Sequence, residues 1–231
     1  MRKVMRKEKK FLLNLASAKQ AERNLAAILA ADPHNGFHGY PVRSLYFDTL
    51  HDRDYAEKLF GTDPRRKVRL RIYDPTADFA LLELKQKQGD NQLKRSLPLC
   101  RAEAERLIAG DYSVLRNRPE PFAAEMYAFM SINGYRPKCI VEYDRTAFVA
   151  KENKIRVTLD RNIRATEANM NIFDPQLCLY PVFDPFNVVL EVKFNGFLLS
   201  YIKTVLNGID KSELSVSKYC LARYVRMGFQ F

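Results

Sequence analysis

Histidine and cysteine are scarce in this sequence, and neither is arranged as a set of metal ligands. There are three histidines, all between residues 34 and 51, and four cysteines spread along the chain without a CxxC pair. Zinc sites use closely spaced pairs of such residues, so this pattern argues against a zinc-binding domain. Scattered cysteines also fit reduced thiols better than a disulfide framework, which predicts a cytosolic protein.

Long apolar runs are also missing. The segment RKEKKFLLNLASA, residues 6–18, resembles a signal peptide, but its apolar run is too short and is interrupted by Asn14. The most apolar region, residues 177–190, contains Pro181, Asp184 and Pro185. We therefore expect no membrane-spanning helix. The sequence predicts a cytoplasmic protein, or one that is attached to a membrane through a separate membrane protein as its partner.

Acidic residues are in the minority. The chain has 27 acidic against 38 basic residues and a net charge of +11, which favours an anionic partner such as nucleic acid, a phosphate-rich ligand or an acidic membrane. No GxxxxGK[ST] motif occurs, so phosphate chemistry of the P-loop type is excluded. With 231 residues, of which 47% are apolar and 12% aromatic, the chain is long and apolar enough to form a large core.

The pattern of elements predicts an α+β fold. No low-complexity linker divides the chain, so we expect a single domain over residues 1–231. Strands are predicted at 7–15, 42–48, 66–74, 79–87, 92–98, 137–149, 154–160 and 187–194. Helices are predicted at 17–31, 52–60, 101–109, 120–132, 197–207 and 214–226, the first opened by Ser17 with Gln20 as a capping box. Many antiparallel strands with helices packed outside them indicate a large sheet or a closed antiparallel β-barrel.

Several predicted strands carry charged residues on one face. In RRKVRLRIYD, residues 65–74, alternation places Lys67, Arg69 and Arg71 on one side and three aliphatic residues on the other. A Glu-x-Lys pattern recurs on three further strands, at 8–10, 83–85 and 191–193. Lys94, Arg145 and Arg156 add single cations on other strands.

These charged faces allow two interpretations. A sheet with one solvated face would show them, and cross-strand Glu–Lys pairs would stabilise it slightly. If the sheet instead curls into a barrel, the cations point inward, where unpaired charges are costly unless water and a polyanion fill the space. The few carboxylates among many cations then suggest a divalent metal, Mg²⁺ or Mn²⁺, bound together with the anion. We favour this second interpretation, a tunnel for a polyanion.

The motifs on these strands resemble those of the triphosphate tunnel metalloenzyme superfamily, and specifically its VTC-type polyphosphate polymerase branch. The resemblance follows the sequence order and runs through nearly the whole chain. It is carried by EKKFLL (8–13), VRSLYFDT (42–49), RRKVRLRIY (65–73), LELKQK (82–87), QLKRS (92–96), VEYDRTAF (141–148), IRVTLD (155–160), LEVKF (190–194) and SVSKYCLA (215–222). The family fold is an antiparallel barrel around a basic tunnel, so the resemblance implies that the cations face inward.

The resemblance also assigns roles to single residues. The phosphate-binding residues that it implies are Lys10, Lys67, Arg69, Arg71, Lys85, Lys87, Lys94, Arg145, Arg156, Lys193, Ser217 and Lys218. Among these, Lys67, Arg69, Arg71, Lys85 and Lys218 are expected to act in catalysis together with Glu191. Glu191 matches the metal-binding glutamate of the family, with Glu83 and Glu8 as weaker candidates.

Polymerase members of the family transfer the γ-phosphate of ATP to a growing polyphosphate chain and release ADP. The resemblance therefore predicts ATP and polyphosphate as partners and a divalent metal, Mn²⁺ or Mg²⁺, as cofactor. A triphosphate hydrolase using the same tunnel and a non-catalytic polyphosphate sensor stay open as alternatives. Nucleic-acid binding is not expected, because the residues interleaved with the cations of 65–74 are mostly aliphatic and lie on the opposite face.

Overall fold

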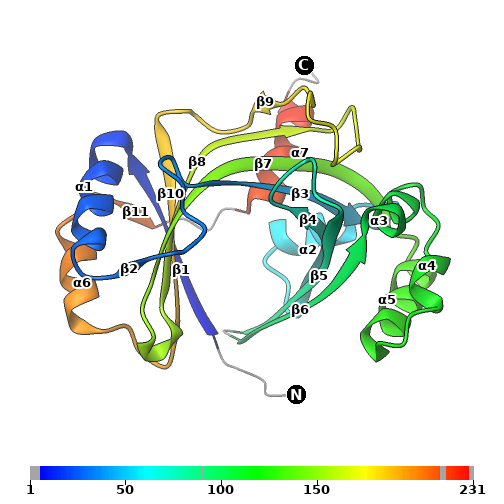
Figure 1. Cartoon of the computed structure of the whole chain (residues 1–231), viewed down its shortest axis with the longest axis horizontal. Helices are drawn as coiled ribbons and strands as arrows, with labels where there is room; N and C mark the ends of the chain where they lie inside the picture. The colour runs from blue at the N-terminus through cyan, green and yellow to red at the C-terminus, as the bar shows by residue number, and fades with distance from the viewer. Residues whose placement is uncertain (1–5, 90, 214–216, 229–231) are drawn as a thin grey trace.

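The computed structural model of the chain describes residues 6–89, 91–213 and 217–228, which form one eleven-stranded sheet with helices against both of its faces (Figure 1). The strands are β1 (Arg6–Asn14), β2 (Ala30–Ala31), β3 (Tyr40–Asp48), β4 (Arg65–Ile72), β5 (Phe79–Gln88), β6 (Asn91–Cys100), β7 (Arg136–Val149), β8 (Arg156–Thr166), β9 (Tyr180–Pro181), β10 (Asn187–Asn195) and β11 (Ser212–Glu213). The helices are α1 (Leu15–Ala26), α2 (Arg53–Leu59), α3 (Arg101–Ile108), α4 (Ser113–Arg116), α5 (Pro121–Ile132), α6 (Ser200–Asn207) and α7 (Lys218–Gly228). The predicted α+β class is confirmed.

Strand register brings the charged residues onto one face. All strand pairs are antiparallel, in the order β11-β1-β10-β8-β7-β3-β4-β5-β6, with β2 on β7 and β9 on β8. Between β4 and β5, Lys67 lies opposite Lys85 and Arg69 opposite Glu83. Since side chains alternate along a strand, these residues share one face, while Val68 between them is fully buried on the other. The sheet curls around the charged face.

The prediction of a closed barrel is wrong. Among the described residues, no strand pairing joins β6 to β1 or β11, so the curled sheet stays open along one side. Figure 1 shows the lower ends of β1 and of the β5–β6 hairpin next to each other, and Lys85 Nζ lies 3.0 Å from the Glu8 carboxylate across this opening. Pro98 lies within β6 and lacks an N–H donor, which is typical of a strand at a sheet edge.

Two hydrophobic cores lie on the outer face of the sheet. One packs α1 and α6 against β1, β8 and β10. The other packs α3, α4 and α5 against β3 to β6. In both, the aliphatic residues that alternate with the charged ones supply the sheet side of the core. Burial of this outer face fixes which face of each strand is left for the interior of the curled sheet.

A third core lies on the inner face, so the prediction that the helices pack only outside is wrong. Tyr55 of α2 and Tyr219 of α7 pack there against Val42, Tyr46 and Tyr143 of the sheet. The Tyr46 and Tyr219 rings stack with centroids 5.1 Å apart. Apolar residues replace charged ones on this part of the inner face, and α7 covers them. The start of α7 is thereby placed inside the curl of the sheet.

Several element boundaries differ from prediction. Helix α1 begins at Leu15, before the predicted Ser17, because Asn14 caps it by accepting a hydrogen bond of 2.8 Å from the Ser17 N–H. It ends at Ala26, since residues 30–31 pair with β7 as strand β2. Strand β8 continues to Thr166, beyond the predicted end at 160. The start of the predicted helix 214–226 lies outside the described residues, which place α7 from Lys218.

No helix within the described ranges combines the length and the apolar character that crossing a membrane requires.

Candidate functional site

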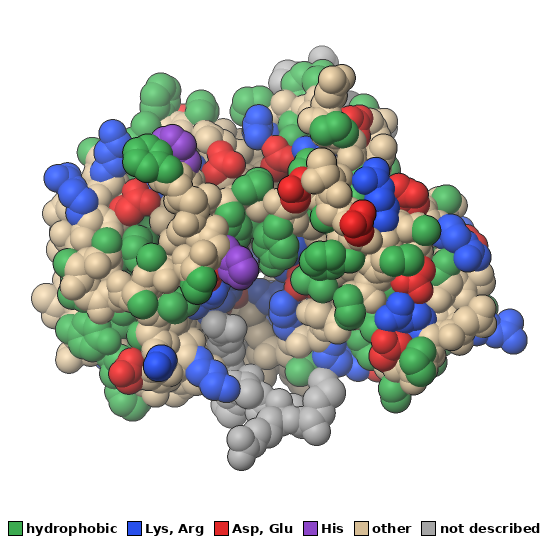
Figure 2. Space-filling model, in the orientation of Figure 1, with side chains coloured by type: hydrophobic (Ala, Val, Ile, Leu, Met, Phe, Trp, Pro, Cys, Tyr) green, Lys and Arg blue, Asp and Glu red, His purple; other side chains and the backbone are tan. Residues whose placement is uncertain are grey.

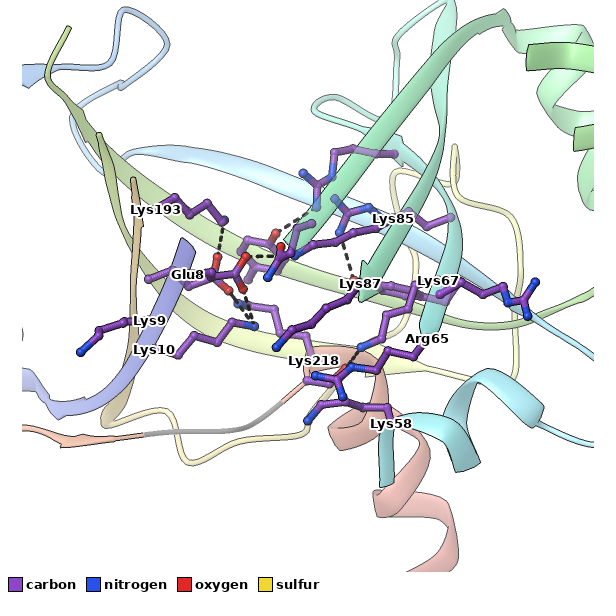
Figure 3. A pocket seen from close by; sticks show the side chains of 18 of the residues that line it. Glu8, Lys9, Lys10, Lys58, Arg65, Lys67, Lys85, Lys87, Lys193 and Lys218 are labelled. Atoms are coloured by element: carbon purple, nitrogen blue, oxygen red, sulfur yellow. Dashed lines mark hydrogen bonds and ion pairs between the residues drawn. The ribbon is translucent and has the colours of Figure 1, made fainter. Parts of the chain in front are cut away.

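The curled sheet encloses a cavity of about 450 Å³ whose lining is dominated by basic side chains. Thirteen of its twenty lining residues are lysine or arginine, and three are glutamate. In Figure 3, Lys67, Lys85 and Lys87 extend from β4 and β5 toward Lys10 and Glu8 on β1. The lining includes these predicted site residues: Glu8, Lys10, Lys67, Arg69, Arg71, Lys85, Lys87, Arg145, Glu191, Lys193, Ser217 and Lys218.

Three predicted residues lie beside the cavity rather than in its lining. Lys94 is 54% exposed and contacts Glu83 at 2.6 Å. Glu83 is almost fully buried. Lys94 binds its Oε1 atom, and Arg69 binds its Oε2 atom through Nε at 2.7 Å and Nη2 at 2.6 Å. Arg156 pairs with Asp32 at 2.6 Å. Glu83 thus pairs with cations through both of its oxygens and, unlike Glu8 and Glu191, lies outside the cavity lining.

The row of cations on β4 is held in place by polar partners. Arg69 is bound by Glu83 and lies 3.2 Å from the Tyr46 hydroxyl. Arg71 donates hydrogen bonds to Ser44 Oγ at 3.2 Å and to the Tyr143 hydroxyl at 3.3 Å. Each guanidinium keeps N–H groups in a fixed orientation, an arrangement that suits bidentate binding of phosphate oxygens.

Lys67 and Lys85 are the lysines whose charge the cavity most disfavours. Burial, reinforced by Lys10, Lys85 and Lys58, lowers the pKa of Lys67 to about 7. Burial also lowers the pKa of Lys85 to about 8, although Glu8 opposes this shift. The Lys67 ammonium donates a hydrogen bond to Ser217 Oγ beside the start of α7. Without an anion, this part of the cavity carries an excess of positive charge that a polyanion would neutralise.

Carboxylates and ammonium groups alternate along the opposite wall. Lys10 Nζ lies 3.2 Å from Glu8 and 3.4 Å from Glu191. Lys218 Nζ lies 3.3 Å from Glu191 and 2.6 Å from Asp160. Burial raises the pKa of Glu191, but Lys193, Lys218, Lys10 and other cations outweigh it, so the net pKa is well below the ordinary range. Glu191 is therefore ionised at neutral pH.

Asp160 belongs to this wall and was missed in the sequence. It is fully buried and accepts hydrogen bonds from Arg145 Nε at 2.7 Å and Nη2 at 2.8 Å, in addition to its contact with Lys218. Alternation along IRVTLD places Asp160 on the same face as Arg156, so strand parity was a signal for it. Asp160 orients two of the cations that face the cavity.

Helix α7 is positioned by a second group of residues that the sequence did not reveal. Asp48 is fully buried and accepts hydrogen bonds from the Tyr55 N–H at 2.9 Å and the Tyr219 hydroxyl at 2.7 Å. Arg223 of α7 binds Asp52 at 2.6 Å. These contacts fix α7 against α2, and they place Ser217 and Lys218 at the cavity.

The carboxylates fit a site for an oxygen-liganded metal. Mg²⁺ in proteins is commonly held by one or two carboxylates, with phosphate oxygens and water completing its coordination. Glu8 and Glu191 both line the cavity and share Lys10 as a neighbour. Cations lower the pKa of both glutamates below the ordinary range, despite burial. The described residues hold no cluster of three or more metal-type ligands, which is compatible with a metal that binds together with phosphate.

Comparisons with solved structures find several proteins of similar length and low sequence identity. A candidate adenylate cyclase from Bacillus halodurans aligns over 88% of this chain and 88% of its own, with 13% identity and a TM-score of 0.48. The PH1819 protein from Pyrococcus horikoshii aligns over 96% of this chain and 99% of its own, with 11% identity and a TM-score of 0.46. A candidate adenylate cyclase from Vibrio parahaemolyticus aligns over 87% and 84%, with 11% identity and a TM-score of 0.44.

No curated protein matches the sequence. The profile of the VTC domain matches residues 5–225, which is nearly the whole chain. The resemblance that the strand motifs indicated is confirmed: this chain belongs to the VTC domain family.

Proposed function

We propose that this chain is a metal-dependent polyphosphate polymerase that transfers the γ-phosphate of ATP to a growing polyphosphate chain. The observation that carries the proposal is the cavity lining, which combines thirteen basic residues with three glutamates in a chain of the VTC domain family. Such an excess of charge is unfavourable in a cavity unless a polyanion occupies it. A chain of linked phosphates supplies many negative charges along one line.

In this reaction the bond between the γ-phosphorus and its bridging oxygen breaks, and ADP leaves. A terminal phosphate oxygen of the polyphosphate forms the new bond to phosphorus. That oxygen is already ionised, so the step needs positioning and charge stabilisation more than a general base. Arg69 and Arg71 would hold phosphate oxygens bidentately, while Lys67, Lys85 and Lys218 neutralise the charge that develops on the transferred group.

Glu191 and Glu8 are the residues that would hold the metal, Mn²⁺ or Mg²⁺. A bound divalent ion supplies charge neutralisation to the phosphate oxygens when it is present. Both glutamates lie within 3.4 Å of Lys10, so an ammonium group also lies close to the predicted metal site. Lys10 would then bind the phosphate oxygens that complete the coordination.

The proposal is tested by incubating the purified protein with ATP and Mn²⁺, separating the products on a gel and assaying ADP and free phosphate. Polymerase activity gives long anionic polymer together with ADP. Free phosphate without polymer would identify a hydrolase instead. Binding of tripolyphosphate without either product would identify a polyphosphate sensor.

The metal assignment has its own test in Glu191→Gln. This change removes the negative charge and keeps the size of the side chain, so we expect metal-dependent turnover to be lost and tripolyphosphate binding to persist. Glu213→Gln is the matched control, because Glu213 lines the same cavity but is exposed. Full activity of Glu191→Gln would contradict the assignment of the metal to Glu191.

The compartment and the membrane partner stay predictions from the sequence. All four cysteines are free thiols, which fits the expected cytoplasmic location. A separate membrane protein would be needed if the product is carried across a bilayer.

A further inference from the structure

Three aromatic residues lie at the same end of three neighbouring strands. Strand β3 begins at Tyr40, Tyr73 directly follows the last residue of β4, and β5 begins at Phe79. These strands are adjacent and antiparallel in the order β3-β4-β5, so the start of β3, the end of β4 and the start of β5 meet at one edge. We call Tyr40, Tyr73 and Phe79 the aromatic rim.

Strand parity places the rim on the same face as the cavity cations. Tyr73 follows Arg69 and Arg71 at alternate positions of the β4 sequence. Phe79 lies an even number of residues from Glu83 and Lys85 on β5, and so points to the same face. Tyr40 likewise lies an even number of residues from Tyr46, which lines the cavity. The rim thus continues the inner face of the sheet beyond its charged part.

Two of the three rim residues are exposed to solvent, and Tyr40 is half-buried. Tyr73 is 43% exposed and Phe79 is 53% exposed. The Tyr40 and Tyr73 rings lie 6.1 Å apart at an angle of 59°, so they are tilted and do not form a parallel stack. Tyr40 also makes an edge contact with the His34 ring. Figure 2 shows a hollow in the middle of the molecular face, with basic side chains inside it and hydrophobic side chains along its upper edge.

Tyr40, at one side of the rim, is held in place by its neighbours. The Tyr40 hydroxyl accepts a hydrogen bond of 2.8 Å from Arg156, which Asp32 holds in turn at 2.6 Å. Gly39, next to Tyr40, packs so closely that a Cβ would lie 2.3 Å from the carbonyl oxygen of Arg145. Tyr40 is therefore fixed beside Arg145, a residue that lines the cavity, and it supports Tyr73 in the rim.

The opposite ends of the same strands differ in chemistry. Arg65 begins β4, Lys87 lies near the end of β5, and Lys58 of α2 joins them in the cavity lining. The inner face thus passes from a basic end, through the cation row of β4, to an aromatic end. Tyr73 lies two residues beyond Arg71, roughly 7 Å along an extended chain. A ribose can span this spacing between a phosphate and a base.

We propose that the aromatic rim is a subsite for the base of a nucleoside triphosphate, which stacks on Tyr73 and Phe79 while its phosphates enter the cation row. This inference rests on the proposed function, because it requires a nucleotide substrate in the cavity. Stacking on an aromatic ring tolerates every base, so the subsite favours nucleotides over inorganic polyphosphate without selecting adenine. It also orients the nucleotide, with its terminal phosphate pointing from Arg71 toward Lys67.

The test compares binding of ATP with binding of inorganic tripolyphosphate by calorimetry, for the full chain under one set of buffer and metal conditions. For Tyr73→Ala and for Phe79→Ala, we expect ATP affinity to fall about tenfold and tripolyphosphate affinity to change by less than about twofold. Tyr73→Phe keeps the ring and should retain ATP affinity. Phe186→Ala is the control, since Phe186 is an exposed phenylalanine outside the rim.

The inference is overturned if Tyr73→Ala and Phe79→Ala leave ATP binding unchanged, or if they weaken ATP and tripolyphosphate equally. If the wild-type protein binds tripolyphosphate in that experiment, the proposed phosphate-binding cavity is retained and only the base subsite is rejected. Wild-type protein that binds neither ligand would overturn both the proposed function and this inference.

Discussion

We expect Lys67 to make the binding of phosphate chains depend on pH. Its pKa is lowered to about 7 by burial among other cations, and a bound polyanion must raise it again. Above pH 7, binding therefore requires uptake of a proton, and affinity falls as pH rises, by at most about tenfold per pH unit for one proton. Below pH 7 the lysine is already protonated, and this dependence disappears.

The measurement is the affinity for tripolyphosphate between pH 6 and 9, for wild type and for Lys67→Met. The protonation of the ligand itself is the same in both experiments, so the difference between the two profiles reports Lys67. We expect the wild-type advantage to shrink as pH rises through 7. Parallel profiles would mean that Lys67 does not change its protonation on binding.

We predict that loss of the Asp160 charge destabilises the fold. It is fully buried, and Arg145 and Lys218 both depend on it. Asp160→Asn leaves these buried cations with only the longer contacts to Glu191, at 3.6 Å from Arg145 and 3.3 Å from Lys218. We expect this loss to lower the free energy of unfolding by about 3 kcal/mol.

Chemical denaturation provides the measurement for this variant. Asp74→Asn is the control, because Asp74 is exposed and its carboxylate accepts hydrogen bonds only within its own turn. We expect this control to stay within about 0.5 kcal/mol of wild type. Equal stability of the two variants would show that Asp160 is not required to neutralise Arg145 and Lys218.

At the scale of elements, the connection from β2 to β3 depends on one glycine. Gly39 has a φ of +87°, and a Cβ there would lie 2.3 Å from the Arg145 carbonyl oxygen. Gly110 has a similar φ of +91°, yet a Cβ there would meet no atom within 4 Å. Comparing substitutions at the two glycines therefore distinguishes the cost of backbone strain from the cost of a steric clash.

We expect Gly110→Ala to cost about 1 kcal/mol through its left-handed conformation alone. Gly39→Ala adds a backbone clash, so its free energy of unfolding should fall by at least about 2 kcal/mol more. Denaturation curves of both variants check this difference. Similar losses would indicate that β3 can move away from β7 without cost.

Helix α7 shows how an element acquires its role from its surroundings. Its own sequence, KYCLARYVRMG, is that of an ordinary amphipathic helix. Its position comes from Tyr219 and Arg223, which bind carboxylates on β3 and next to α2. These contacts bring Lys218 into the cavity, so that α7, like α2 through Lys58, contributes to a site built mainly from strands.

At the scale of the whole molecule, the net charge of +11 and the basic cavity predict that a polyanion stabilises the fold. Tripolyphosphate at about 100 times its dissociation constant should raise the melting temperature by about 5–10 °C. At a fixed concentration of tripolyphosphate, this shift in melting temperature should become smaller as the salt concentration rises, because ions screen the charges at the cavity mouth.

Thermal denaturation with and without tripolyphosphate, at several salt concentrations, measures this effect. Sodium chloride at matched ionic strength is the control for general screening. A shift no larger than that of the control would contradict specific binding of the anion in the cavity.

The sequence by itself determined which residues share a face. Alternation in RRKVRLRIYD and in the Glu-x-Lys strands depends only on the period of an extended chain, so Lys67, Arg69, Arg71, Lys85, Glu191 and Lys193 were placed correctly together. The family followed from the same motifs, because their order along the chain is itself specific.

Only the tertiary structure decided how these faces meet. Whether the sheet closes depends on pairing between β1 and β6, which are strands distant in sequence. Within the part of the chain that the structure describes, no strand pairs with the outer edge of β6. The tertiary structure also decided the partners of two buried carboxylates. Glu83 binds Arg69 and Lys94, and Asp160 binds Arg145 and Lys218. The partner of a buried charge is chosen by three-dimensional proximity, which strand periodicity does not encode.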